Sequence, residues 1–198
     1  MQSVFHTISD KLVQDGYIIL EDILDKTLTQ ALYKRIQSLK STDLSEASIG
    51  RGSQHHNNSN IRSDKTIWLD GDEKSEKAYL LWMVNLKQEL NQALYLGLHD
   101  YETHFAHFAQ GTFYQKHFDV LHGNNKRLLT TVFYLTKDWK DGDGGELLIY
   151  NKDGNRIIQT VAPKMGTMVI FLSDKFPHEV LASKKDRYSI AGWFRGRS

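Results

Sequence analysis

The sequence contains no cysteine among its 198 residues. This absence excludes a disulfide framework and a thiolate metal site, so any bound metal ion would need nitrogen and oxygen ligands. The sequence also lacks an excess of either charge, because 25 lysines and arginines are balanced by 24 aspartates and glutamates, for a net charge of +1. A protein that binds nucleic acid through its charge would carry a basic excess or patch. We therefore expect no nucleic-acid partner.

Long apolar runs are absent as well. No stretch reaches the roughly 20 apolar residues that a membrane-spanning helix needs, and residues 1–6 lack the basic start and apolar run of a signal peptide. We therefore expect a cytoplasmic protein without a membrane partner. The hydrophobic content of 40% and charged content of 25% are typical of soluble globular proteins.

The first half of the chain shows two helical patterns separated by a polar segment. Leu28, Leu32 and Ile36 recur at helical spacing, and a second amphipathic stretch runs from about residue 73 to residue 96. The segment 41–60 between them has no periodic apolar pattern, which indicates a long loop. Loops of this length are often lids over binding sites.

From about Tyr101 the pattern changes to short strands separated by turn residues such as Asp153-Gly154. Eight such strands in succession indicate a double-sheet jelly roll. We therefore predict a mostly β, α+β fold in a single domain, 1–198. In it a double-stranded β-helix (about 101–198) packs on long helices (about 1–100), and the lid loop belongs to the helical part. The expected strands are 104–109, 113–119, 128–135, 146–150, 156–162, 167–172, 179–182 and 188–194.

Three residues of metal-binding type are spaced so that such a fold could bring them together. His117 and Asp119 lie two apart in a strand-like segment, so their side chains would point to the same face. His178 follows a Phe-Pro pair and precedes another strand, which places it at a strand mouth. Two imidazoles and one carboxylate form the facial triad of non-haem Fe(II) oxygenases. Zinc could bind the same set, as in hydrolytic sites, but the sequence offers no evident general base beside it.

Arg187 lies nine residues after His178, at the start of the last predicted strand. A keto acid that chelates iron has a second, distal carboxylate, and a guanidinium can grip a carboxylate with two hydrogen bonds. Ser189 lies on the same strand face, and Tyr134 could add another hydroxyl. Alternatives remain open: a surface salt bridge for Arg187, and a position at the core edge for Tyr134. His104, on a strand, fits a structural histidine better than a ligand.

Several motifs occur in a fixed order along the chain. They are Ile61-Arg62-Ser63-Asp64-x-x-x-Trp68, Tyr114-x-x-His117-x-Asp119, Arg127-x-x-Thr130, Tyr134-Leu135-x-x-Asp138-Trp139, Gly144-Gly145-Glu146-Leu147, Pro177-His178-Glu179-Val180 and Arg187-Tyr188-Ser189-Ile190-x-x-Trp193-Phe194. This set resembles the Fe(II)/2-oxoglutarate-dependent dioxygenases of the prolyl 4-hydroxylase superfamily. It is most similar to the bacterial relatives of the hypoxia-inducible-factor prolyl hydroxylases, and the resemblance covers roughly residues 10–195.

The resemblance implies roles for individual residues. The three ligand candidates would bind iron, and Arg187 would pair with the distal carboxylate of 2-oxoglutarate, with Tyr134 hydrogen-bonding nearby. The chain departs from the family where many relatives carry a tyrosine whose hydroxyl touches the keto acid. Phe108 or His107 takes that place; Phe108 would lose the hydrogen bond, whereas His107 would replace it. The other residues implied in or around the pocket are Trp193, Tyr114, Arg62, Asp64 and, on a mobile loop, Arg51.

The resemblance also implies an activity. The enzyme would use Fe(II), 2-oxoglutarate and O2, with ascorbate as reductant, to hydroxylate a C–H bond and release succinate and CO2. The expected target is a prolyl residue of a protein or peptide. The alternatives are hydroxylation of another side chain or a small metabolite, and a non-enzymatic jelly-roll module that binds a metal or carbohydrate. Asp119 favours hydroxylation over halogenation, because related halogenases carry a small residue there and leave the position to chloride.

Overall fold

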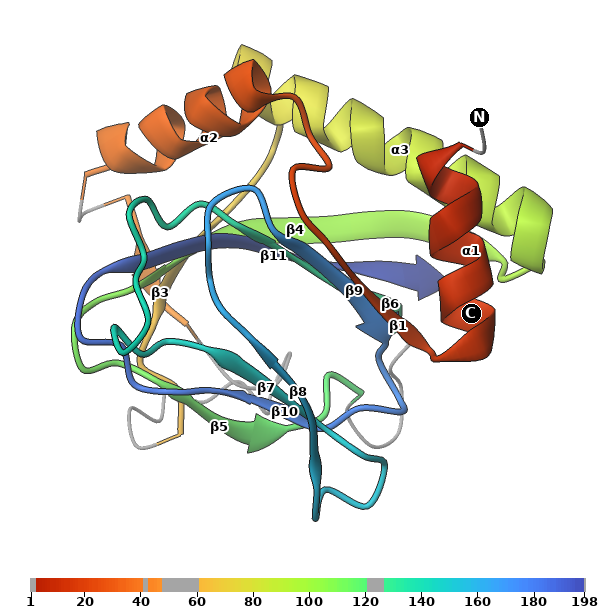
Figure 1. The fold of residues 1–198 in the computed structure, drawn as a ribbon. Helices are drawn as coiled ribbons and strands as arrows, with labels where there is room; N and C mark the ends of the chain where they lie inside the picture. Colours follow the sequence, from red (N-terminus) through yellow and green to blue (C-terminus); the bar gives the residue numbers. More distant parts are fainter. Residues whose placement is uncertain (1–2, 41–42, 48–60, 121–126, 198) are drawn as a thin grey trace.

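The computed structural model describes residues 3–40, 43–47, 61–120 and 127–197. The helices of this part lie together on one side of a large β-sheet, and a smaller sheet lies on its other side (Figure 1). The helices are α1 (Val4–Gln14), α2 (Lys26–Ser38) and α3 (Lys74–Leu94).

The strands form two sheets in which every pairing of named strands is antiparallel. The large sheet has the order β1-β9-β6-β11-β4-β3-β2, and the small sheet has the order β5-β10-β7-β8. This arrangement confirms the predicted jelly roll packed on long helices. The strands are β1 (Tyr17–Leu20), β2 (Ser45–Glu46), β3 (Lys65–Trp68), β4 (Leu98–Phe108), β5 (Tyr114–His117), β6 (Arg127–Tyr134), β7 (Leu147–Tyr150), β8 (Ile157–Val161), β9 (Met168–Leu172), β10 (His178–Val180) and β11 (Arg187–Gly196).

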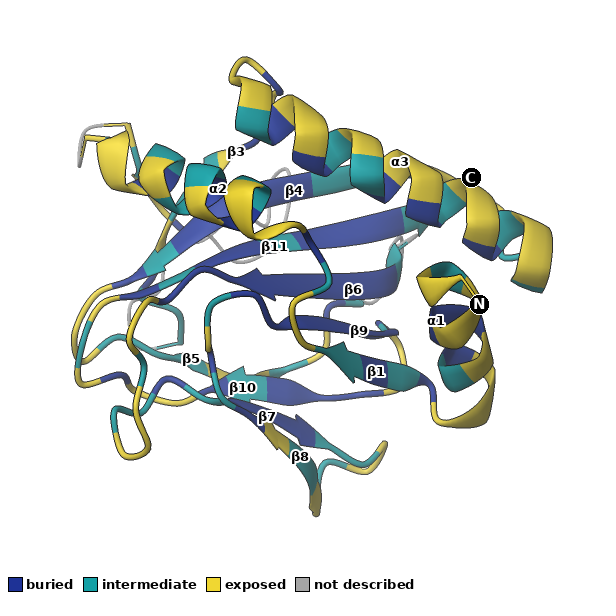
Figure 2. Cartoon of the chain, turned by 45° about the horizontal axis from the view of Figure 1, so that its top comes forward, coloured by how far each residue is buried: buried dark blue, intermediate teal, exposed yellow. Residues whose placement is uncertain are grey.

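The helices form where the sequence provides a cap and an apolar stripe. The Asp25 carboxylate accepts hydrogen bonds from the backbone nitrogens of Thr27 (2.8 Å) and Leu28 (3.3 Å), and so caps α2. Leu32 and Ile36 then lie one turn apart on its buried face. Figure 2 shows the same division on all three helices: the faces toward the sheet are buried and the outer faces are exposed. None of the described helices is both long and apolar enough to span a membrane.

Two hydrophobic cores result, one on each face of the large sheet. β11 divides its residues between these two faces by alternation. Ile190 and Phe194 belong to the core beneath the helices, whereas Arg187, Ser189 and Trp193 point into the space between the sheets. The side of the large sheet away from the helices therefore carries the polar residues of interest.

The first half of the chain contributes more than helices. β1 pairs with β9, and β3 pairs with β4, so both complete the large sheet. The predicted boundary at about residue 100 therefore does not separate a helical part of the chain from a β part, because β1 and β3 come before it. Strands of four residues show too little alternation to be distinguished from a short helix or loop. α1, which the pattern did not predict either, begins with Ser3 as its N-cap.

Candidate metal centre

The three predicted metal ligands meet at one end of the small sheet. His117 is the last residue of β5, His178 is the first of β10, and the two are direct partners in the antiparallel ladder. Asp119 lies two residues beyond the end of β5, so a bend, not a continuous strand, directs its side chain toward the histidines. One ligand atom from each residue lies within 4.8 Å of the others. Spacing of this kind fits a single metal ion.

Both histidines are oriented for metal binding through Nε2. Nδ1 of His117 lies 2.7 Å from the carbonyl oxygen of Gln115, and Nδ1 of His178 lies 3.0 Å from that of Phe176. A carbonyl oxygen can only accept, so Nδ1 carries the proton in each ring and Nε2 keeps its lone pair. Burial lowers the pKa of His178 to about 4, although Asp119 opposes this shift, so the ring is neutral at physiological pH.

The Asp119 carboxylate faces both histidines. Its Oδ1 lies 3.7 Å from Nε2 of His117, and its Oδ2 lies 3.5 Å from Nε2 of His178. Burial alone would raise the pKa of Asp119, but interactions with the two histidines and the positive charge of Arg127 lower it well below its usual range. The carboxylate is therefore ionised and brings a negative charge to the ligand set.

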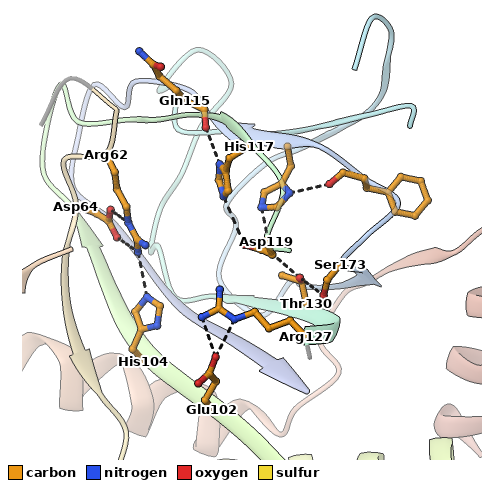
Figure 3. Close-up of polar contacts among 12 residues, drawn as sticks. Arg62, Asp64, Glu102, His104, Gln115, His117, Asp119, Arg127, Thr130 and Ser173 are labelled. Carbon is orange, nitrogen blue, oxygen red and sulfur yellow. Dashed lines mark hydrogen bonds and ion pairs between the residues drawn. The ribbon is translucent and has the colours of Figure 1, made fainter. Parts of the chain in front are cut away.

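One hydroxyl group contacts the Asp119 carboxylate and a second contacts the first, and the sequence pattern assigned a role to neither. The Thr130 hydroxyl donates a 2.6 Å hydrogen bond to Oδ2 of Asp119 and lies 2.9 Å from the Ser173 hydroxyl (Figure 3). The strand pattern of 128–135 could have indicated Thr130, because Thr130 and Tyr134 share one strand face. Ser173 lies just past β9, and no local signal connects it to Asp119.

Arg187 is only 2% exposed, yet no carboxylate of the described residues forms an ion pair with it. Its Nε donates to the carbonyl oxygen of Gly145 (2.9 Å), and its Nη1 donates to the Ser189 hydroxyl (3.3 Å). The guanidinium carbon lies 4.7 Å from the centroid of the Phe108 ring and 5.0 Å from that of Tyr134. Neutral groups thus hold this buried cation, whose charge an anion in the cavity would neutralise.

Tyr134 supplies a second unsatisfied group beside Arg187. Its hydroxyl is buried and makes no well-formed hydrogen bond within the described part of the chain. Burial raises the pKa of Tyr134, although the Arg187 guanidinium acts in the opposite direction. The hydroxyl is therefore protonated and can donate to an anion that Arg187 attracts.

The metal ligands and Arg187 line one cavity between the two sheets, and Ser189 and Trp193 line it with them. Trp193 lies between two polar side chains: its ring stacks on His104 at a centroid distance of 5.3 Å, and Arg127 covers it at 3.6 Å. His104 was expected to be a satisfied structural histidine. It lines the cavity instead, and its Nδ1 has no hydrogen-bond partner in the described residues.

The resemblance implies a position beside the entrance of the pocket for Arg62 and Asp64. Arg62 and Asp64 form an ion pair with a nitrogen–oxygen distance of 2.6 Å, and both line the cavity (Figure 3). The Arg62 guanidinium lies over the ring of Tyr114, which stacks on His117 at a centroid distance of 3.6 Å. A continuous set of contacts therefore runs from the Arg62–Asp64 pair to a metal ligand.

The structure corrects the prediction for His107. Alternation along β4 turns Phe108 into the cavity and His107 away from it. His107 instead stacks on Tyr188 at a centroid distance of 4.7 Å and lies 3.6 Å from Asp186. Phe108 therefore occupies the position beside Arg187, with no hydrogen bond to offer. Arg51 lies outside the described residues.

Comparison with known proteins agrees with this geometry. Residues 103–195 match the sequence pattern of the 2OG-Fe(II) oxygenase superfamily. The crystal structure of a Pseudomonas putida prolyl-4-hydroxylase is similar over 98% of this chain and 100% of that one, with 33% identity and a TM-score of 0.88. A Trichoplax adhaerens prolyl hydroxylase in complex with a hypoxia-inducible-factor oxygen degradation domain peptide fragment shares the fold, with 24% identity, a TM-score of 0.84, and 97% and 89% of the two chains covered.

Curated relatives are longer than this chain. Human Egl nine homolog 1 is 26% identical over 187 residues, which cover 90% of this chain and 43% of that protein. The rat protein of the same name is 25% identical, with 90% of this chain and 55% of that protein covered. The chain thus spans about half the length of these relatives.

Proposed function

The chain belongs to the 2OG-Fe(II) oxygenase superfamily, and from this premise we propose that it is an Fe(II)- and 2-oxoglutarate-dependent dioxygenase that hydroxylates a prolyl residue of a protein or peptide. Succinate and CO2 would be the products of the co-substrate. The observation that carries the proposal is a buried Arg187, without a carboxylate partner among the described residues, in the same cavity as a His-Asp-His ligand set.

The described residues fit an Fe(II) ion. Nε2 of His117, Nε2 of His178 and one carboxylate oxygen of Asp119 would hold it, which matches the two-histidine, one-carboxylate set that non-haem iron prefers. Three protein ligands leave positions open for a co-substrate and oxygen. A module that only binds a metal would have no use for the buried cation at Arg187.

The same residues fit 2-oxoglutarate. We assign the distal carboxylate of the co-substrate to Arg187, because an anion there removes the cost of a buried unpaired charge. The Tyr134 hydroxyl would donate to the same carboxylate, while Ser189 keeps Nη1 of the guanidinium in place. Phe108 limits this pocket by packing against the guanidinium.

When bound, iron and 2-oxoglutarate supply the oxidation, in which the keto acid yields succinate and CO2 and one oxygen atom of O2 enters the substrate. The chain supplies position and protection. Val132, Leu147 and Val180 line the cavity with apolar surface that excludes water from the reacting groups. Ascorbate as reductant stays a prediction of the resemblance.

Support for a prolyl target comes from the relatives. The Pseudomonas putida protein is a prolyl-4-hydroxylase by its description, and the Trichoplax adhaerens structure holds a peptide. The Arg62–Asp64 pair and Trp193 also line the cavity, and we place the peptide against them. Hydroxylation of another side chain or of a small metabolite is the alternative activity.

Two measurements test the proposal. The first is succinate formation from 2-oxoglutarate by purified protein, with Fe(II) present or chelated and with cell extract as a source of substrate. We expect Fe(II)-dependent succinate that a His178→Ala variant does not produce. His99→Ala is the matched control, because His99 is an exposed histidine on β4 outside the cavity.

The second measurement identifies the substrate. Proteomes of cells that express the wild-type protein or His178→Ala are compared by mass spectrometry for a hydroxylation that the variant lacks. A prolyl residue at that place supports the full proposal. A hydroxylated residue of another type would keep the dioxygenase and reject the prolyl target, and a lack of succinate under every condition would reject the dioxygenase.

A further inference from the structure

Two adjacent glycines, Gly144 and Gly145, lie just before β7 in conformations that side chains rarely adopt, with φ of +74° and +76°. A Cβ on Gly144 would lie 2.4 Å from the carbonyl oxygen of Ala182. A Cβ on Gly145 would lie 3.1 Å from Cδ of Arg187 and 3.1 Å from the Ser183 side chain. The two glycines thus allow the backbone to approach the segment before β11 more closely than any other residue could.

This close approach brings a backbone acceptor to Arg187. The carbonyl oxygen of Gly145 accepts the 2.9 Å hydrogen bond from Nε, while the nitrogen of Gly145 donates to the carbonyl oxygen of Ala182 at 3.3 Å. The preceding carbonyl, on Gly144, accepts a 2.9 Å hydrogen bond from the indole nitrogen of Trp139. Hydrogen bonds on both sides therefore hold the two-glycine turn.

The contacts of Arg187 leave its guanidinium little freedom. Since the group is planar, a hydrogen bond at Nε and rings on two sides together fix its plane and the direction of its outer nitrogens. Ser189 occupies one N–H of Nη1. Apart from the nearby Tyr134 hydroxyl, the remaining outer N–H groups have no partner in the described residues, and they are the donors available to a carboxylate.

We propose that the Gly144–Gly145 turn is a positioning device for Arg187, which uses the Gly145 carbonyl to set the orientation in which the guanidinium receives the distal carboxylate of 2-oxoglutarate. This inference rests on the proposed function. Gly145 acts through Arg187, and Trp139 acts through the turn. Neither touches the metal ligands, so both affect the affinity for the co-substrate and not that for the metal.

The test compares two glycine-to-alanine variants by calorimetry. Gly145→Ala forces Arg187 or Ser183 to move, whereas Gly142→Ala is the matched control: Gly142 also has a positive φ, +89°, but no atom lies within 4 Å of its added Cβ. The probes are Mn(II) alone, as a stand-in for Fe(II) that allows work in air, and 2-oxoglutarate added to the Mn(II)-loaded protein.

We expect Gly145→Ala to weaken 2-oxoglutarate binding about 10-fold or more, as expected for a misdirected charge-assisted hydrogen bond, with Mn(II) affinity unchanged. Gly142→Ala should change neither constant. In turnover with Fe(II), the KM for 2-oxoglutarate should rise in Gly145→Ala while kcat at saturation is retained. General destabilisation of the fold would not raise KM and leave kcat unchanged.

A second variant covers the case in which Gly145→Ala does not fold. Trp139→Phe keeps an aromatic ring but removes the indole N–H that holds Gly144, and it should weaken 2-oxoglutarate binding by a smaller factor, about 2- to 5-fold. Unchanged 2-oxoglutarate affinity in Gly145→Ala, or in Trp139→Phe where Gly145→Ala does not fold, would overturn the positioning role alone. Failure of the wild-type Mn(II) protein to bind 2-oxoglutarate would overturn the proposed function and this inference with it.

Discussion

At the scale of single residues, the hydroxyl of Thr130 decides how Asp119 meets a metal ion. It donates a 2.6 Å hydrogen bond to Oδ2 and so fixes the orientation of the carboxylate. Groups that orient a metal ligand from behind typically contribute 10- to 100-fold to metal affinity. We expect Thr130→Val to raise the dissociation constant for Mn(II) by about that factor, measured by calorimetry on the metal-free protein.

The neighbouring threonine provides the control. Thr131 is equally buried but faces the helices, where its hydroxyl contacts the Tyr101 hydroxyl at 2.7 Å. Thr131→Val should lower the stability of the fold and leave Mn(II) affinity unchanged. If both variants weaken Mn(II) binding equally, Thr130 acts through the stability of the fold and has no specific effect on Asp119.

Burial of His104 in the cavity wall makes the stability of the folded protein depend on pH. Burial and the charges of Arg62 and Arg127 hold the pKa of His104 well below its usual value of 6.5, although Asp119 opposes them. In the unfolded chain the imidazole takes up a proton near pH 6.5, while in the folded protein it does so only at a lower pH. Its contribution to stability is therefore fully present above pH 6.5 and is lost as the pH falls toward the folded-state pKa.

A His104→Phe variant tests this dependence, because phenylalanine fills a similar volume without titrating. Between pH 6.5 and pH 5, the free energy of unfolding of the wild type should fall more steeply than that of the variant, by up to about 1.4 kcal/mol per pH unit. Urea denaturation of both proteins in chelator, at several pH values, measures the two slopes. Identical slopes would show that His104 takes up its proton without hindrance in the folded state.

At the scale of elements, an ion pair between a partly exposed arginine and a buried glutamate joins α2 to α3. Nε of Arg35 lies 2.7 Å from Oε1 of Glu76, whose side chain is only 3% exposed, and Oε2 accepts a 3.3 Å hydrogen bond from the nitrogen of Gly71. Removal of one member of such a pair leaves a buried charge without compensation. We expect Arg35→Met to lower the free energy of unfolding by about 3 kcal/mol.

The double variant separates the destabilisation caused by an unpaired Glu76 charge from the net contribution of the ion pair to stability. Arg35→Met combined with Glu76→Leu should recover most of the lost stability, because apolar side chains of similar size can replace a buried pair at little cost. Lys34→Met, at an exposed site on the same helix, is the control for the loss of a positive charge. Urea denaturation compares these proteins with wild type and with Glu76→Leu alone; a double variant whose loss equals the sum of the two single losses would contradict the coupling.

At the scale of the whole molecule, the site joins the two sheets. The metal ligands belong to β5, β10 and the bend that follows β5, in or beside the small sheet, whereas Arg187 belongs to β11 in the large sheet. A bound metal should stabilise the small sheet, and 2-oxoglutarate should add a second increment because it neutralises Arg187 across the cavity. Each ligand at 100 times its dissociation constant contributes about 2.7 kcal/mol.

The two ligands should therefore raise the thermal unfolding temperature, Tm, in two separate increments. We expect Mn(II) to raise Tm, and 2-oxoglutarate to raise it again by roughly 5–10 °C, but only with metal present. Arg187→Met should retain the first shift and lose the second. A second increase in Tm that persists in this variant would place the co-substrate away from Arg187. Succinate, which lacks the keto group, serves as the control ligand.

The amino-acid composition is enough to predict the chemistry of the ligands. Without cysteine, the metal set had to be built from histidine and carboxylate, and His117, Asp119 and His178 are the residues that meet. The strand pattern also predicts the jelly roll. Alternation in β11 predicts which face of this last strand lines the cavity, because it assigns Arg187 and Ser189 to one side. These features follow from local periodicity, which the sequence records directly. The single-domain boundaries and the roles of the site residues stay predictions.

The groups that support the site become evident only in the folded chain. Thr130 and Ser173 lie 43 positions apart, and Gly145 lies 42 from Arg187, yet each pair is in hydrogen-bond contact. Periodicity tells which face a side chain points to, but not which residue of another strand it meets there. The choice between Phe108 and His107 depended on the register of β4 against β11, which is a contact between segments distant in sequence. Such contacts form only when segments distant in the sequence come together, within the large sheet or across the cavity, and they give the metal ligands and Arg187 their orientation.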